Sequence, residues 1–340
     1  MAKVDGTQSI SVYCAKSILP HLEALKDNAQ KILRRKNEED IHDLRVATRR
    51  IGTVLDIFQD QFPSKKTKSW IKGIQKITKS FSSVRDLDVQ INTLEEIFQT
   101  VDDPKIRKGI GRLRLRLNQN RKKKQAKTQN LTDTILESTI VLEMLAWAEA
   151  ALEHRSTEEV FPSQELFQLA YKKIQSKLNE LLFFEVFIFD PGRIKELHQM
   201  RISAKRLRYA LEVFADLYKR KTDFALNTAR EAQEYLGSIH DADVWIEFLP
   251  KFAIEEQERI HEFYGYNSSY MRITPGIDYL LKNRNLVRGK LYKDFINDWK
   301  KWKLKETWLN LRKVIFLSSL ESQVSIADSN TENTEEPDSL

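Results

Sequence analysis

The sequence predicts an all-α protein built from two similar helical halves. Only 10 glycines and 8 prolines occur among its 340 residues. This scarcity, together with abundant Leu, Lys, Glu, Ala and Gln, favours long helices over strands. Hydrophobic residues make up 41% of the chain, enough to bury a core in two units of ordinary size. A pattern of basic and apolar residues that occurs twice indicates that the two halves are related.

Apolar periodicity and local breaks place the expected helices. Asp40, Pro63–Ser64 and Asp103–Pro104 mark starts in the first half, and a loop at 156–162 is expected to divide the chain. The first half is expected to hold helices at roughly 8–36, 40–61, 64–82, 86–100, 103–127 and 130–153. The second is expected to hold helices at roughly 163–187, 191–219, 221–238, 241–262, 275–283 and 285–318, with an irregular connection at 264–275. We therefore predict helical halves at residues 1–155 and 156–320.

The C-terminal segment 321–340 reads as a polar tail. It holds six acidic residues and no basic one, and it is rich in Ser, Asn and Thr. Such a composition predicts disorder. The net charge of the whole chain is +7, so the part before the tail is more basic than this value suggests. A basic surface favours anionic partners but says nothing about the fold.

Two further features bear on the location of the protein. The single cysteine, Cys14, cannot form an intramolecular disulfide, excludes a cysteine-rich zinc site and fits a reducing compartment. The N-terminus does not read as a signal peptide, and no run of about 18 apolar residues predicts a membrane span. We expect a cytoplasmic protein with no membrane partner.

One short motif occurs in both halves. Residues 42–50 read HDLRVATRR and residues 198–206 read HQMRISAKR, 156 positions later. The corresponding basic residues are His42 and His198, Arg45 and Arg201, Arg49 and Lys205, and Arg50 and Arg206. The apolar residues Leu44, Ile51, Leu55 and Phe58 correspond in the same way to Met200, Leu207, Leu211 and Phe214. A second pair, RDLDV at 85–89 and HDADV at 240–244, follows at an offset of 155. This order predicts two facing halves related by a pseudo-twofold axis.

On a helix, the motif separates its basic residues from its apolar ones. His42, Arg45 and Arg49 fall within about 60° of one another, roughly opposite the apolar stripe. The matching face of the second helix carries His198, Arg201, Lys205 and Arg208. Cations at this spacing repel one another, and a bridging anion would remove that cost. Arg offers a planar donor fork for phosphate oxygens, and His adds a donor that charges near neutral pH.

These motifs resemble those of the CHAD family, named for a histidine-bearing α-helical domain. The family's first motif is similar to H-x-x-R-V-x-x-R-R in the first half and to H-x-x-R-I-x-x-K-R-L-R-Y in the other half. Its other motif is similar to RDLDV and to HDADV, which is preceded by Leu236–Gly237. The likeness covers about residues 8–318. It implies two four-helix-bundle-like halves, related by a pseudo-twofold axis, around a basic channel that binds inorganic polyphosphate without catalysis and without a cofactor. No triphosphatase-type domain is recognisable, so the chain resembles a stand-alone member.

The expected binding site combines the repeat with two other basic stretches. Residues 105–127 contain eleven bases and no acid, and lysines at 65, 68, 72, 76 and 79 follow one helical stripe. The residues expected to bind polyphosphate are His42, Arg45, Arg49, Arg50, His198, Arg201, Lys205, Arg206, Arg208, Lys76, Lys79, Arg107, Arg114, Arg121 and Lys124. A solvated, exposed face is the alternative for both stretches. Gly52 stands where the second half has Arg208, so the two halves of the site should be unequal.

Further partners follow from the same chemistry. Other polyanions, phosphate or sulfate ions are candidate ligands, and polyphosphate-metabolising enzymes are candidate protein partners. Association with polyphosphate granules would be consistent with these partners. The D-x-D pairs at 86–88 and 241–243 are expected at helix starts, where one carboxylate caps and the other lies in the first turn. Salt bridges from these carboxylates would hold the binding arginines.

Two other functions stay open from the sequence. The adjacent pairs His42–Asp43 and His240–Asp241 also fit a metal-dependent phosphohydrolase, but the arginines beside the repeated histidines disfavour a divalent cation. The charge also permits a nucleic-acid-binding module, although no helix-turn-helix, RNA-binding sheet or zinc motif is readable. We therefore expect no metal site and no enzymatic activity.

Overall fold

The computed structural model describes residues 6–35, 38–136, 138–153 and 163–331, and within these ranges it contains helices and no strand. The prediction of an all-α fold is confirmed. The first half contains α1 (Gly6–Arg35), α2 (Glu38–Ile57), the short 3-10 helix η1 (Gln59–Gln61), α3 (Ser64–Gln99), α4 (Pro104–Leu136) and α5 (Thr139–Glu153). The second contains α6 (Gln164–Phe183), η2 (Phe184–Phe187), α7 (Ile194–Val213), α8 (Asp223–Tyr264), α9 (Ser268–Met271), α10 (Thr274–Leu304) and α11 (Thr307–Thr331).

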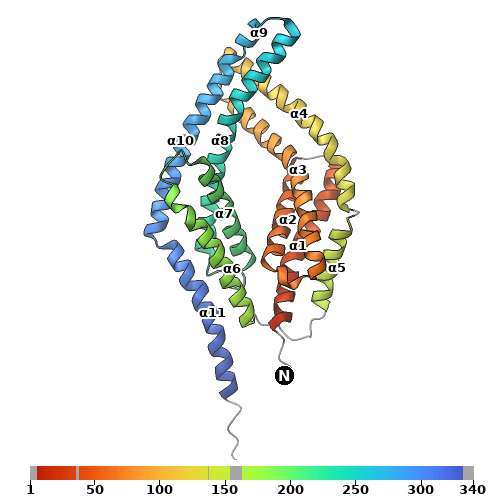
Figure 1. Cartoon of the computed structure of the whole chain (residues 1–340), viewed down its shortest axis with the longest axis vertical. Helices are drawn as coiled ribbons and strands as arrows, with labels where there is room; N and C mark the ends of the chain where they lie inside the picture. Colours follow the sequence, from red (N-terminus) through yellow and green to blue (C-terminus); the bar gives the residue numbers. More distant parts are fainter. Residues whose placement is uncertain (1–5, 36–37, 137, 154–162, 332–340) are drawn as a thin grey trace, which may run out of the picture.

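The two halves pack their helices in the same order. In the first half, α1 packs on α2 and α5, α2 on α3, and α3 on α4. In the second, α6 packs on α7 and α11, α7 on α8, and α8 on α10. Figure 1 shows the two groups side by side, with α2 and α7 on their facing sides. The repeated order favours a pseudo-twofold relation between the halves, which stays a prediction.

One apolar core runs through both halves. The repeated apolar residues are all buried: Leu44, Ile51, Leu55, Phe58, Met200, Leu207, Leu211 and Phe214. The ring centroids of Phe58 and Phe214 lie only 5.8 Å apart. Since these two residues correspond in the repeat, their contact marks the boundary at which α2 and α7 meet.

A second core lies at one end of the molecule, where the long helices of both halves converge (Figure 1). It contains Leu94 of α3, Leu113 of α4, Leu249 of α8 and Leu280 of α10. Here α4 and α10 approach so closely that a Cβ on Gly276 would lie 2.6 Å from the Cα of Gly109. This end joins the halves, while α2 and α7 face each other lower in the same view.

Several expected helix boundaries are wrong. The breaks expected at 82–86, 238–241 and 283–285 are absent, because α3, α8 and α10 run straight through them. Ser82 donates to the carbonyl oxygen of Thr78 at 2.8 Å, so its hydroxyl is satisfied inside the helix and caps nothing. Conversely, the helix expected at 285–318 is divided at Glu306, whose φ of 50° is incompatible with a helix.

Two further sequence expectations concern the C-terminal tail and membrane-spanning helices. Helix α11 continues to Thr331, past residue 320, where we expected the ordered chain to end. The rest of the expected tail, residues 332–340, lies outside the described residues. None of the described helices combines the length and the apolar character needed to cross a membrane.

Candidate functional site

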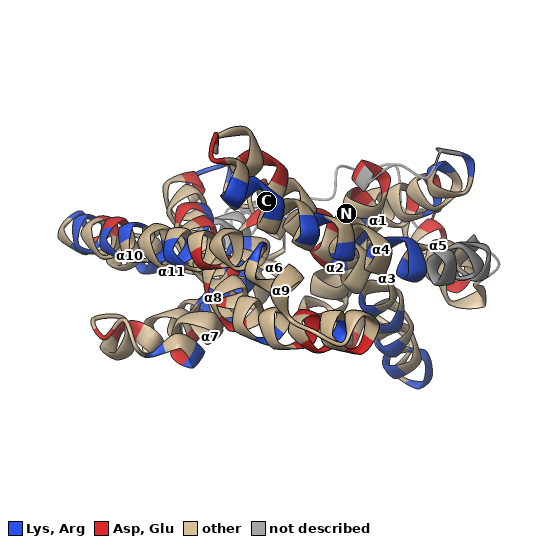
Figure 2. Ribbon diagram, turned by 90° about the horizontal axis from the view of Figure 1, so that it is seen from above, with Lys and Arg blue, Asp and Glu red and all other residues tan. Residues whose placement is uncertain are grey.

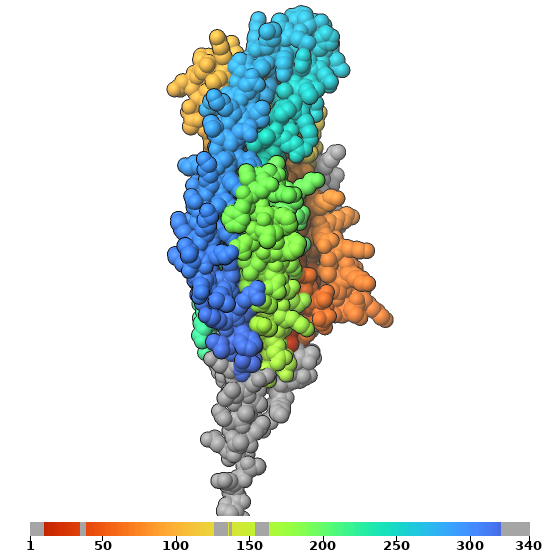
Figure 3. Space-filling model, turned by 60° about the vertical axis from the view of Figure 1, so that its left-hand side comes forward, coloured from red at the N-terminus to blue at the C-terminus, as the bar shows by residue number. Residues whose placement is uncertain are grey.

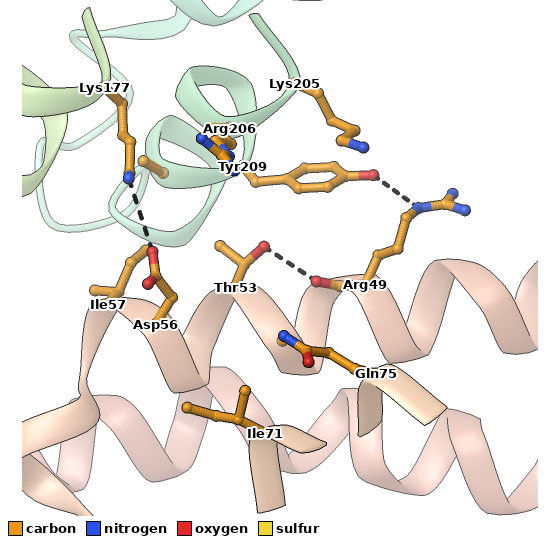
Figure 4. Close-up of a pocket in the computed structure, with 12 residues that line it drawn as sticks. Arg49, Thr53, Asp56, Ile57, Ile71, Gln75, Lys177, Lys205, Arg206 and Tyr209 are labelled. Atoms are coloured by element: carbon orange, nitrogen blue, oxygen red, sulfur yellow. Dashed lines mark hydrogen bonds and ion pairs between the residues drawn. The ribbon is translucent and has the colours of Figure 1, made fainter. Parts of the chain in front are cut away.

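The basic faces of α2 and α7 meet across the boundary between the halves. The Nε of Arg49 on α2 donates a hydrogen bond to the hydroxyl of Tyr209 on α7 at 3.2 Å. Figure 4 shows Lys205 projecting from α7 toward the same place. Lys205 occupies the position in the repeat that corresponds to Arg49. The two corresponding cations are therefore brought together by the facing helices.

The pKa of Lys205 is lowered by its burial and by the cations that surround it. Burial is the main cause that lowers the pKa of this ammonium to about 8, followed by Arg201 on its own helix and Arg49 of α2. Arg206 and Arg45 act in the same direction. A lysine pKa falls in this way when its charged form is desolvated and has cations as neighbours. Cations of both halves thus share one electrostatic site.

On the first half of the chain, Arg45 of α2 contributes a cation to this site. Its guanidinium is half-buried and donates to the hydroxyl of Ser82 and, at 3.4 Å, to the carbonyl oxygen of Thr78 on α3. Burial, and then the charges of Arg49 and Arg85, lower the pKa of Arg45, with Asp86 opposing them. Burial and the same group of arginines, led by Arg85, also lower the pKa of His42. These shifts leave His42 a neutral donor at neutral pH.

A pair of histidines forms the second-half side. The Nδ1 atoms of His198 on α7 and His240 on α8 lie 3.2 Å apart, and their ring centroids lie 4.2 Å apart. Burial and the partner imidazole lower the pKa of His198, while burial and Arg201 lower that of His240. In the contact between the two rings, one imidazole accepts where the other donates. Protonation of both rings would place two like charges side by side, and an anion beside them would lower that cost.

A cavity of about 620 Å³ lies beside this cluster, between the two halves. Arg49 and Thr53 of α2 line one wall, and Lys205 and Tyr209 of α7 line the other (Figure 4). Gly52 of α2 also lines the cavity. At its rim, the Nζ of Lys177 on α6 lies 3.8 Å from the carboxylate of Asp56 on α2. The cavity opens to solvent between helices that present cations, so an elongated anion can enter it.

The family model of the CHAD domain matches residues 16–250, which is more than half of the chain. This chain belongs to the CHAD domain family. The crystal structure of the CHAD domain from the plant Ricinus communis is 19% identical, with a TM-score of 0.55; the match covers 83% of this chain and 91% of that one. PptA from Streptomyces chartreusis is 13% identical, with a TM-score of 0.52, over 84% of this chain and 99% of that one. Both similarities show the fold. No curated protein matches the chain.

Three of the expected binding residues on α2 and α7 of this CHAD domain are engaged by carboxylates of the chain. The guanidinium of Arg50 on α2 lies 3.5 Å from the carboxylate of Glu212. Arg208 also pairs with Glu212, at 2.9 Å. Arg206 lines the cavity and lies 3.3 Å from Glu180 of α6. These residues sit around the site rather than at the meeting point of Arg49 and Lys205.

The basic stretch on α4 divides between its arginines and its lysines. Arg107 donates to the carbonyl oxygens of Phe98 and Val101, at 3.1 and 2.7 Å, and so ties α4 to the end of α3. Arg114 lies 2.5 Å from Glu95, and Arg121 pairs with the buried Asp88. The remaining arginines, Arg112 and Arg116, both pair with the fully buried Glu256 of α8. The lysines at 105, 108, 122, 123 and 124, in contrast, are exposed.

The D-x-D pairs lie inside helices, so the expectation that they cap helix starts is wrong. In α3, Asp86 is exposed while Asp88 is buried against Arg121, as expected for positions two apart on a helix. In α8, Asp243 pairs with Arg288 of α10. Two carboxylates thus do pair with arginines, as the sequence suggested, and each ties a long helix to its neighbour.

Some residues of the site were not among those expected from the sequence. Arg85 and His240 correspond in the second motif pair, and that correspondence was a usable signal. Tyr209 follows the basic residues of α7 in the motif, but nothing in its sequence context indicates a bond to Arg49. Lys177 lies on α6, outside every motif. Among the residues that the structure describes, no group of three or more His, Cys, Asp or Glu side chains is placed to hold a metal ion.

Proposed function

We propose that this CHAD domain binds inorganic polyphosphate, without turning it over, in the basic site between α2 and α7. The observation that carries the proposal is the position of Lys205, whose pKa is held near 8 by burial and by arginines of both halves. Bringing these cations together costs free energy in the absence of an anion. A chain of phosphates offsets this free-energy cost, because each phosphate carries about one negative charge and offers acceptor oxygens to the cations around it.

The choice of polyphosphate among polyanions rests on the family and on the shape of the site. CHAD domains are known as polyphosphate-binding modules, and the cavity lies between two helices that both contribute cations to its lining. A nucleic acid would also contribute phosphates, but its bases need aromatic or groove-reading contacts. The aromatic residue at the centre of the site, Tyr209, is 7% exposed and its hydroxyl is used by Arg49. It therefore offers no stacking face to a base.

Binding without catalysis is supported by the chemistry around the histidines. Arg45, Arg49 and Arg85 all act on His42, and Arg201 acts on both His198 and His240. Such a concentration of positive charge opposes the binding of Mg²⁺ or Mn²⁺ at these imidazoles. A cytoplasmic location and association with polyphosphate granules belong to the same proposal; the unpaired Cys14 fits a reducing compartment.

The test is a titration of long-chain polyphosphate against the wild type and two variants. Replacing Arg45 and Lys205 together by Gln should weaken binding about 100-fold or more, because two charge-assisted contacts are lost. The matched control replaces the exposed Lys290 and Lys293 of α10 by Gln and should bind as the wild type does. Equal affinity of all three proteins would overturn the proposal. Thermal unfolding of each variant separates loss of the site from loss of the fold.

Two further measurements separate the competing functions. Polyphosphate should displace single-stranded DNA or RNA at a much lower phosphate concentration than the reverse, and preference for nucleic acid would contradict the proposal. Phosphate release from polyphosphate with added Mg²⁺ or Mn²⁺ should stay at the level of a blank. Robust turnover, abolished by substitution of His42 or His240, would instead establish a phosphohydrolase.

A further inference from the structure

The lysines of α3 form an exposed basic stripe outside the site between α2 and α7. Lys65, Lys68, Lys72, Lys76 and Lys79 are all exposed. Their spacing puts them on one face of the helix, over a length of about 20 Å at 1.5 Å per residue. None of the five takes part in an ion pair within the described part of the chain. Figure 2 shows Lys and Arg recurring along α3, and in Figure 3 side chains of this segment project from the edge of the molecule.

Two cavities that share lining residues lie between the stripe and the site. A second cavity, of about 350 Å³, lies between α2 and α3 and is lined by Lys79 at one end. Arg49, Gly52 and Gln75 line both this cavity and the larger one that contains Lys205. These shared residues give an extended anion a route from Lys205, past Arg49 and Gln75, to Lys79.

Gly52 leaves this passage open. A Cβ built on Gly52 would meet nothing within 4 Å, so there is open space directly beside this residue. The corresponding residue of the second half is Arg208, which is bonded to Glu212 at 2.9 Å and to Gln233 at 3.3 Å. The equivalent place in the second half thus carries a long side chain whose guanidinium is held by two hydrogen bonds.

The second half carries acidic residues at three of the five positions where the first half has the lysine stripe. At the offset of the second motif pair, Lys68, Lys76 and Lys79 correspond to Asp223, Glu231 and Glu234 of α8. Lys72 corresponds to the neutral Asn227, and Lys65 corresponds to Arg220, which precedes α8. Glu231 and Glu234 are exposed and line a depression together with Asp298 of α10. A polyanion leaving the site toward α8 would meet carboxylates, while one leaving toward α3 meets lysines.

We propose that a polyphosphate chain longer than the site leaves it over Gly52 and runs along the lysine stripe of α3, so that the domain binds long chains with one fixed exit. The inference rests on the proposed function, because it needs the chain to be anchored between α2 and α7. It adds a second, outer binding surface that short chains do not reach. Long chains then bind more tightly than short chains because they make additional contacts with the lysines of α3. Helix α8 makes no such contacts.

The experiment compares tripolyphosphate, which fits within the site, with long-chain polyphosphate. The test variant replaces Lys65, Lys68 and Lys72 by Gln; these three residues lie beyond both cavities. The control variant replaces Lys290, Lys293 and Lys300, three exposed lysines of α10, by Gln and so has the same net charge. The test variant should bind long chains about 10-fold more weakly, with a salt dependence shallower by about 2 in log–log slope. Its affinity for tripolyphosphate should equal that of the wild type.

The outcomes separate this inference from the proposed function. Unchanged long-chain binding by the α3 variant, or an equal loss in the α10 control, would overturn the exit along α3. An equal loss for tripolyphosphate and the long chain would also overturn it, because the lysines would then belong to the inner site. If the Arg45 and Lys205 double variant still binds both ligands fully, the proposed function itself fails. A Gly52→Leu variant adds an independent check, since closing the passage should reduce the advantage of long chains over tripolyphosphate.

Discussion

Arg49 of α2 donates to the hydroxyl of Tyr209 of α7, with 3.2 Å between Nε and the oxygen, across the boundary between the two halves. Tyr209 corresponds in the repeat to Thr53, which lines the same cavity from α2. The ring of Tyr209 is also approached by Arg208, whose Cζ lies 5.3 Å from its centroid. One buried tyrosine thus orients a cation of the site and packs against a second cation, Arg208, that is held by the carboxylate of Glu212. This arrangement ties the geometry of the binding surface to the contact between the halves.

A Tyr209→Phe variant tests whether the hydroxyl positions Arg49. The ring and its packing are kept, so the unfolding temperature should change little. Affinity for polyphosphate should fall about 3- to 10-fold, because Arg49 loses the bond that holds its guanidinium toward the ligand. Calorimetric titration of the two proteins measures the difference. An affinity equal to or above that of the wild type would show that the hydroxyl competes with the ligand instead of orienting the arginine.

Lys205 predicts how binding depends on alkaline pH. Its pKa in the free domain is about 8, and a bound polyanion raises this pKa because it stabilises the ammonium. The protonated lysine is therefore favoured in the complex, so affinity should be full below pH 8 and fall as the pH rises through this value. Titrations between about pH 7 and pH 9.5 follow the loss.

The Lys205→Arg variant is the control for this pH dependence. An arginine stays charged throughout the range, so the alkaline fall should flatten while binding near neutral pH is kept. If the variant loses affinity with pH as steeply as the wild type does, another group is responsible and the assignment to Lys205 is wrong.

The sequence predicted the core of the two repeated helices well. The spacing of Leu44, Leu55, Met200 and Leu211 determined which faces of α2 and α7 are buried, because helical periodicity alone decides this. The sequence failed where serines and aspartates suggested breaks in α3 and α8. Side chains such as Ser82 bond back to their own helix, and Asp88 finds Arg121 on a neighbouring helix. Tertiary partners removed the need for a cap, and local sequence does not contain them.

The basic stretch on α4 shows that the sequence also gives limited information about the site. Nothing in the sequence distinguishes the arginines of this stretch from its lysines as candidate ligand contacts. In the structure, the arginines have partners on distant elements, such as Glu256 of α8 for Arg112. A planar guanidinium suits such bidentate, partly buried contacts, whereas a lysine keeps its hydrated charge at the surface. The role of Arg107, Arg114 and Arg121 in binding stays a prediction. The repeat itself, in contrast, indicated which two helices would bring Arg49 and Lys205 to one place.

His21 predicts that the domain loses stability in acid. Burial, and then the charge of Arg50, lowers the pKa of His21 to about 4, with Glu212 opposing. A histidine with a lower pKa in the folded state binds fewer protons there than in the unfolded chain, where its pKa is about 6.5. Its contribution is therefore fully present above pH 6.5 and is lost as the pH falls from there toward 4. The loss is smaller than about 3.4 kcal/mol, the limit set by 1.36 kcal/mol for each pH unit, because solvent screens the partly exposed imidazole.

Thermal unfolding at several pH values between 7.5 and about 4 measures this effect. The wild type should unfold at progressively lower temperature as the pH falls, and a His21→Gln variant should show a shallower dependence. His42, His198 and His240, whose pKa values are also lowered, add to the slope in both proteins. Parallel curves for the wild type and the variant would exclude His21 as a source of the acid sensitivity.

The crossing of α4 and α10 predicts opposite effects of the same substitution at two glycines of one helix. A Cβ on Gly276 would lie 2.4 Å from the carbonyl oxygen of Ile106 and 2.6 Å from the Cα of Gly109. Both contacts are with backbone, which cannot move aside like a side chain, so Gly276→Ala should reduce the free energy of unfolding by about 1 to 3 kcal/mol. Gly289 lies on α10 with nothing within 4 Å of a built Cβ, so Gly289→Ala should increase it by about 0.5 to 1 kcal/mol. Urea unfolding compares the three proteins. Equal stability of Gly276→Ala and the wild type would mean that the two helices can separate without cost, and that this crossing does not fix the distance between the halves that the binding site requires.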